Sequence, residues 1–263
     1  MSNILYIGGG LGFIFLMTTL GSATVLLFRR PLGASAHTVF LGFAAGVMIA
    51  ASVWSLLIPA IDSAQAEGQI GWIPAAGGVV LGALFLYALD HLIPHLHPET
   101  NAREGVPTRF KRPTLLVLAV TLHNIPEGMA VGLSLALAVQ HGGDPVFFAS
   151  ATALALGIGI QNFPEGAAIS LPLRQEGVSA PKAFLAGVGS GVVEPVFGLL
   201  TVALAAFVIP IMPWLLAFAA GAMLYVVVEE LIPEAHLSAA HHLGTASVLF
   251  GFLVMMVLDV ALG

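Results

Sequence analysis

The sequence predicts an all-α polytopic membrane protein with eight transmembrane helices, inverted-repeat pseudo-symmetry and both termini on the extracytoplasmic side. Composition, apolar runs and the placement of basic residues predict this class. Of the 263 residues, 58% are hydrophobic and only 8% are charged, and the mean hydropathy is +1.00. A soluble domain carries roughly 25% charged residues. So few charges cannot cover a surface that faces water, so lipid must surround most of the chain.

Eight apolar runs follow one another along the chain. The first, residues 4–28, contains no charged residue over 25 positions, which is enough for a helix to cross a ~30 Å hydrocarbon core. It is too long for a cleaved signal peptide, and no basic segment precedes it. Backbone polar groups in lipid must bond within their own segment, so each run is expected to be a helix. The runs are residues 4–28, 37–61, 72–96, 113–138, 145–171, 183–208, 212–235 and 243–262. A polar linker, residues 97–112, divides the single transmembrane domain of residues 1–263.

The basic residues predict the orientation of these helices. All eight Lys and Arg residues fall in three connections, which would lie on one side of an eight-span protein. Because Lys and Arg are enriched in cytoplasmic loops, these connections are expected in the cytoplasm and both termini outside. The basic residues are Arg29, Arg30, Arg103, Arg109, Lys111, Arg112, Arg174 and Lys182. The compact chain favours a bacterial plasma (inner) membrane, and the absence of cysteine excludes disulfides and thiolate metal sites.

Three acidic residues fall near the middle of expected spans, where no Lys or Arg can pair with them. They are Glu127, Glu165 and Glu194. A carboxylate near the centre of a bilayer costs on the order of 3 kcal/mol. Three unpaired charges would therefore cost about as much as the whole stability of an ordinary protein. Protons or a bound cation must neutralise these acids.

Two similar hexapeptides favour the cation. HNIPEG, residues 123–128, returns as QNFPEG, residues 161–166. Positions i, i+1 and i+4 share one helical face, so imidazole, amide and carboxylate groups can converge on one point. Such groups bind divalent metals, and a proline inside each hexapeptide frees a backbone carbonyl. The expected ligands are His123, Asn124, Glu127, Gln161, Asn162 and Glu165, with Glu194 added by close packing at Gly187-x-x-x-Gly191.

The order of the spans gives the repeat a symmetry. Spans four and five would run in opposite directions, so the same motif on both creates a pseudo-two-fold axis in the membrane plane, as in transporters built from inverted repeats.

A second polar cluster is expected at the cytoplasmic ends of spans three and seven and would suit the release of a cation. Its members are Asp90, His91, His95, Glu229, Glu230, Glu234 and His236.

With HNIPEG, QNFPEG, the Glu194 segment and EELIPEAH, the chain resembles the ZIP (Zrt-, Irt-like protein) family of divalent-metal transporters, and especially its short bacterial branch. The resemblance implies no enzyme but a binuclear metal centre between spans four, five and six, made of the seven ligands named above. It also implies Zn²⁺ as the leading substrate, with Fe²⁺, Mn²⁺ and Cd²⁺ as further substrates, uptake into the cytosol and a homodimer. No nucleic-acid partner is expected. Some relatives carry aspartate where this chain has Asn162, which leaves one negative charge fewer.

Two other functions fit the residues alone. A metal exporter or proton-coupled antiporter would use the same acids, because sequence does not fix the direction of movement. An intramembrane metallohydrolase would use the same His and Glu residues to hold a catalytic zinc. The usual H-E-x-x-H motif of such enzymes is absent, and an enzyme would leave the repeat without an explanation.

Overall fold

A computed structural model describes residues 3–27, 33–92, 95–96, 103–104, 112–142, 144–175, 177–205, 211–236 and 241–262. Within these ranges some side chains are not described, among them those of Asp90, His95, His123, Glu234 and His236.

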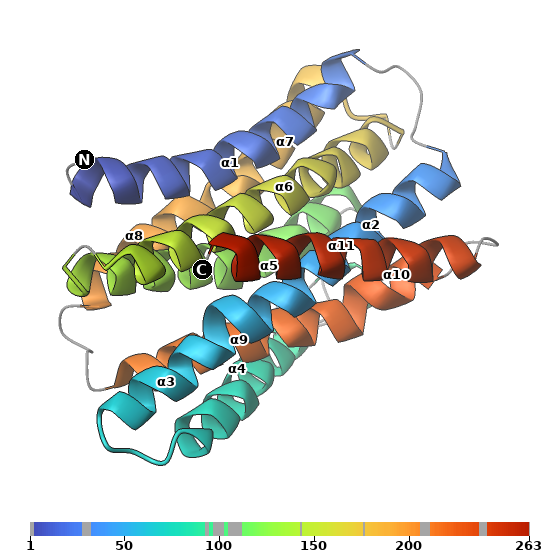
Figure 1. Ribbon diagram of the computed structural model, residues 1–263. Helices are drawn as coiled ribbons and strands as arrows, with labels where there is room; N and C mark the ends of the chain where they lie inside the picture. The colour runs from blue at the N-terminus through green and yellow to red at the C-terminus, as the bar shows by residue number, and fades with distance from the viewer. Residues whose placement is uncertain are drawn as a thin grey trace.

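The described chain is almost entirely helical, and its long helices lie side by side in one bundle (Figure 1). The α-helices are α1 (Asn3–Leu27), α2 (Ala34–Ala51), α3 (Ile58–Ala66), α4 (Trp72–Leu92), α5 (Arg112–Gln140), α6 (Pro145–Gln175), α7 (Ala180–Gly191), α8 (Val193–Ala205), α9 (Met212–Val226), α10 (Ile232–His236) and α11 (His241–Leu262). Two π-helices, η1 (Ser52–Leu57) and η3 (Val227–Leu231), join α2 to α3 and α9 to α10.

Within the described ranges, eight helical segments are long and apolar enough to cross a membrane, so the predicted all-α fold with eight spans is confirmed. The segments are Asn3–Leu27, Thr38–Ala66, Trp72–Leu89, Val120–Gln140, Pro145–Arg174, Ala180–Leu204, Met212–Leu231 and His242–Ala261. The start of α1 and the end of α11 lie at the same end of the bundle (Figure 1). That position agrees with an even number of spans, while the side of the membrane on which the termini lie stays a prediction.

Large apolar side chains cover the outside of the bundle. Ile4, Leu84, Leu199 and Leu253 are among them, and each is about half exposed or more. Such a surface suits contact with lipid tails and not with water. In contrast, α5 is enclosed, because α1, α6, α7, α8 and α9 all pack against it. Polar side chains on α5 are therefore removed from both water and lipid.

Glycines let α1 and α6 touch backbone to backbone. A Cβ atom on Gly166 would overlap the carbonyl oxygen of Thr18, and one on Gly21 would overlap that of Phe163. Small residues allow this close approach of membrane helices, which van der Waals contact then stabilises. The backbone of QNFPEG is thereby held against the middle of α1.

Three other helix pairs approach in the same way: α2 with α11, α4 with α9, and α5 with α8. In each pair a Cβ atom added to one glycine would overlap a carbonyl oxygen of the partner helix. The glycine and carbonyl pairs are Gly46 with Val248, Gly82 with Phe218, and Gly128 with Glu194.

Three spans contain interruptions that the apolar pattern did not predict. The π-helices η1 and η3 end at Leu57 and Leu231, the first residues of the LIP sequences that contain Pro59 and Pro233. Span six is divided at Val192, three residues before Pro195. A proline has no N–H to donate to the carbonyl four residues earlier, and π-turns are one way in which a helix absorbs such an irregularity. By contrast, α5 and α6 continue through Pro126 and Pro164.

The predicted linker, residues 97–112, lies mostly outside the described residues. Its last residue, Arg112, already belongs to α5. Two-residue strands β1 (His95–Leu96) and β2 (Arg103–Glu104) pair antiparallel, and β1 packs against α5. β1 thus occupies the end of the predicted third span, whose helix ends at Leu92, and β2 lies within the predicted linker.

Candidate metal centre

Six of the seven predicted ligands have described side chains, and all six are buried near the contact of α5, α6 and α8. Their exposed fractions are 9% for Glu165, 1% for Asn124 and 0% for Glu127, Gln161, Asn162 and Glu194. The seventh, His123, lies on α5 next to Asn124, but its side chain lies outside the described part of the chain.

A hydrogen bond joins the two hexapeptide motifs. Gln161 Nε2 on α6 donates to Glu127 Oε1 on α5 over 2.8 Å. A carboxylate only accepts hydrogen bonds, so the nitrogen of the Gln161 amide must face it and the amide oxygen must face away. The bond thus occupies one oxygen of Glu127 and turns the Gln161 carbonyl elsewhere.

Asn162 contacts Glu194 in the same way as Gln161 contacts Glu127. Asn162 Nδ2 donates to Glu194 Oε2 over 2.8 Å, and Thr18 Oγ1, on α1, donates to Glu194 Oε1 over 2.8 Å. Asn124 Nδ2 donates to the carbonyl oxygen of Ser190 over 3.0 Å. Every side-chain amide nitrogen of the site therefore points at an acceptor.

Four buried oxygen atoms of the site have no hydrogen-bond partner among the described side chains and backbone: Asn124 Oδ1, Glu127 Oε2, Gln161 Oε1 and Asn162 Oδ1. Buried polar atoms without a partner are rare, and each one needs an explanation. All four carry lone pairs and no proton to donate. A group of acceptors without donors repels anions and fits a metal cation, which amide and carboxylate oxygens coordinate.

The charges of the site have the same sign. Glu127 lies close enough to both Glu165 and Glu194 for their carboxylates to repel one another. No Lys or Arg occurs at positions 113–173 or 183–263 of the sequence, so these helices offer no permanent positive charge. Such carboxylates need protons or a cation to share the space.

Within the described side chains, no group of three or more His, Asp and Glu residues lies in a geometry ready to hold a metal. The polar side chains of the site are instead a mixture of amides and carboxylates. The polar atoms described at the site are thus mainly amide and carboxylate oxygens, which are hard donors.

The predicted release cluster is only partly described. His91 is exposed, and its Nδ1 atom lies 2.9 Å from the carbonyl oxygen of Tyr87. Glu229 is exposed, whereas Glu230 is buried. The side chains of Asp90, His95, Glu234 and His236 lie outside the described residues. The cluster therefore stays a prediction.

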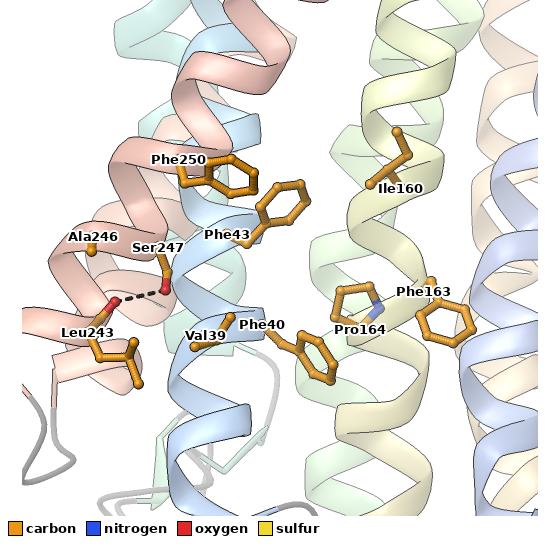
Figure 2. Close-up of a pocket in the computed structure, with 10 residues that line it drawn as sticks. All are labelled: Val39, Phe40, Phe43, Ile160, Phe163, Pro164, Leu243, Ala246, Ser247 and Phe250. Atoms are coloured by element: carbon orange, nitrogen blue, oxygen red, sulfur yellow. Dashed lines mark hydrogen bonds between the residues drawn. The ribbon is translucent and has the colours of Figure 1, made fainter.

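An apolar pocket of about 480 Å³ lies between α2, α6 and α11 (Figure 2), and none of the predicted ligands lines it. Its lining includes four phenylalanines, Phe40, Phe43, Phe163 and Phe250, together with Pro164 of the QNFPEG motif. The hydroxyl of Ser247 points at its own helix, where it donates to the carbonyl of Leu243 over 2.7 Å. Without free donor or acceptor atoms, this pocket does not suit a cation.

Sequence patterns missed Thr18 and Ser190, because isolated hydroxyl residues are common in membrane helices. Thr18, only 1% exposed, is in direct contact with a predicted ligand. Asp259 on α11 is a further buried acid, away from the predicted ligands, and is 7% exposed. It accepts a hydrogen bond of 2.6 Å from Ser55 through Oδ1.

Comparison with known proteins assigns the family. A family profile described as ZIP zinc transporter matches residues 108–259, more than half of the chain and all four helices α5 to α8 around the site. The chain belongs to the ZIP family. It is therefore a membrane transporter and not an enzyme, and the alternative of an intramembrane hydrolase is wrong.

Relatives within the ZIP family match the chain over almost its whole length. Zinc transporter ZIP11 of Homo sapiens is 40% identical over 97% of this chain and 96% of its own length. Zinc transporter GufA of Myxococcus xanthus is 39% identical over 94% of both chains. Zinc transporter ZIPB of Bordetella bronchiseptica is 39% identical over 98% of this chain and 81% of its own.

Proposed function

We propose that this ZIP protein carries Zn²⁺ into the cytosol through a binuclear site between α5, α6 and α8. The four unpartnered buried oxygen atoms carry the proposal, because a divalent cation is the ligand that satisfies acceptors of this kind. The ligands would be His123, Asn124, Glu127, Gln161, Asn162, Glu165 and Glu194.

Zinc leads the proposed substrates because the similar proteins are named zinc transporters. The donors do not select it strongly. Oxygen ligands with one imidazole and no thiolate also suit Fe²⁺ and Mn²⁺, so these ions and Cd²⁺ are proposed as competing substrates.

The proposed path runs from the outside to the site and then to the cytoplasmic cluster that contains His91, Glu229 and Glu230. We place the protein, as a homodimer, in a bacterial plasma membrane. In this orientation the positively charged loops face the cytoplasm, in agreement with the distribution of Lys and Arg.

Proteoliposomes test transport and its direction. Purified protein is reconstituted, the fraction facing each way is measured by protease cleavage, and Zn²⁺ movement is followed with an indicator inside the vesicles. We expect Zn²⁺ to move toward the face that carries the basic loops, with Fe²⁺, Mn²⁺ and Cd²⁺ as competitors. Net movement the other way would favour the exporter, and movement that requires a proton gradient would favour the antiporter.

Asn162→Asp tests the second cation position. In the wild type, an amide N–H of Asn162 satisfies Glu194 where a cation could lie. Aspartate would place two carboxylates in contact, and a cation between them would relieve the repulsion. We expect the variant to bind a second Zn²⁺ at least about tenfold more tightly than the wild type, a gain of about 1.4 kcal/mol, by equilibrium dialysis. Identical stoichiometry and affinity in both proteins would contradict the binuclear proposal.

A further inference from the structure

Both oxygen atoms of the Glu194 carboxylate are occupied by protein donors from two other helices. Thr18 on α1 holds Oε1 and Asn162 on α6 holds Oε2, each over 2.8 Å. Glu127, in contrast, keeps one oxygen free. A cation that approaches Glu194 therefore meets oxygens that each already share a lone pair with a protein donor, whereas Glu127 Oε2 accepts no hydrogen bond from the described residues.

The two donors share an alternative acceptor. The carbonyl oxygen of Ile14 lies 3.2 Å from Thr18 Oγ1 and 3.5 Å from Asn162 Nδ2. A threonine hydroxyl has one proton, so Thr18 donates mainly to one of its two acceptors at a time. When Glu194 turns to a cation, Thr18 can rotate its proton to Ile14 and is not left as an unpaired buried donor. The exchange thereby avoids the usual penalty for such a group.

The position of Thr18 is rigid, although its hydroxyl can rotate. Its backbone carbonyl lies directly against Gly166 of the QNFPEG motif, and Gly191 leaves room for its methyl group. A Cβ atom at position 191 would lie 2.8 Å from Thr18 Cγ2. The hydroxyl is thus held at one fixed place beside Glu194, where it can return as soon as the carboxylate is free.

We propose that Thr18 is a positioning residue that competes with the transported cation for Glu194 and so hastens the release of that cation. The inference rests on the proposed role of Glu194 as a cation ligand. Without the hydroxyl, the cation-free state loses a hydrogen bond to the charged Glu194 carboxylate. The cation-bound state therefore becomes more stable relative to the cation-free state.

Thr18→Val tests this competition, because valine keeps the volume and removes the hydroxyl. Initial Zn²⁺ flux into proteoliposomes is measured against Zn²⁺ concentration. The expected result is a KM about tenfold lower and a kcat about tenfold lower than in the wild type, in keeping with the strength of a hydrogen bond to a charged group. Thr18→Ser, which restores the hydroxyl, is expected to bring both constants back toward their wild-type values.

The neighbouring residue provides a matched control. Thr19 lies on the same helix, and its buried hydroxyl has no hydrogen-bond partner. Thr19→Val makes the same chemical change without touching Glu194, so KM and kcat should stay at wild-type values.

The two constants separate a positioning role from a structural one. General damage at Thr18 raises KM or lowers kcat alone, and either result overturns the proposal, as does a Thr18→Val protein with wild-type constants. If Thr18→Val does not survive purification, Thr18→Ala is subject to the same criteria. Failure of the proposed function looks different, since the wild-type protein would then move no Zn²⁺ at all.

Discussion

Glu127→Gln is expected to reduce Zn²⁺ flux into proteoliposomes by at least about a hundredfold. The substitution keeps the size of the side chain and replaces a charged oxygen, Oε2, which is fully buried and has no hydrogen-bond partner. Loss of one partner from a buried charge pair costs roughly 3–5 kcal/mol, and each 1.4 kcal/mol changes an equilibrium about tenfold. The amide nitrogen would also meet Gln161, whose own amide now donates to this position.

The matched control is Glu67→Gln. Glu67 is exposed in the turn after α3, and its carboxylate accepts a hydrogen bond from Gln69, far along the chain from the predicted ligands. The flux of this variant should therefore equal that of the wild type. Equal fluxes for wild type and Glu127→Gln would remove Glu127 from the cation path and, with it, the proposed site.

Gly166→Val is expected to destabilise the fold by at least about 3 kcal/mol, the upper range for overpacked cores. A Cβ atom at this position would overlap the backbone of α1 at Thr18, and no side chain can move away to make space. By the scale of soluble domains this loss corresponds to a melting temperature roughly 10 °C lower. Thermal unfolding of the purified protein in detergent measures it.

Gly12→Val serves as the control for this substitution. A Cβ atom on Gly12 would meet nothing within 4 Å, since this part of α1 faces outward. Its melting temperature should stay close to that of the wild type. A Gly166→Val protein as stable as Gly12→Val would show that α1 and α6 do not touch through their backbones.

The number of helices and the buried acids could be predicted because each depends on a single strong cost. An apolar run of about 25 residues crosses lipid stably only as a helix. A carboxylate inside a span, such as that of Glu127 or Glu194, needs a partner that neutralises it. Local breaks depend on smaller differences. The sequence does not show whether Pro59 is absorbed by a π-turn or Pro195 by a break at Val192, because both cost similar amounts.

The orientation of the amides could not be predicted either. Helical spacing places Asn124, Gln161 and Asn162 beside the acids, but the direction of each amide depends on contacts with other helices. Asn124 turns its nitrogen to Ser190 on α7, and Asn162 turns its own to Glu194 on α8. The role of Thr18 has the same origin. Only the packing of α1 on α6 brings its hydroxyl to Glu194.

Backbone contact within the four glycine-lined helix pairs restricts how the protein can change shape. At these glycines no side chain stands between the two backbones, so no change of rotamer there can let one helix slide along the other. Each pair is therefore expected to move as one rigid unit, and relative motion is expected at the contacts between pairs. The pocket of Figure 2 lies at the contact between two such pairs, where Phe40 and Phe43 of α2 face Ile160 and Pro164 of α6. The free volume of the pocket gives the rings of Phe40 and Phe43 space to turn. The contact between the two pairs can therefore change while each pair stays rigid.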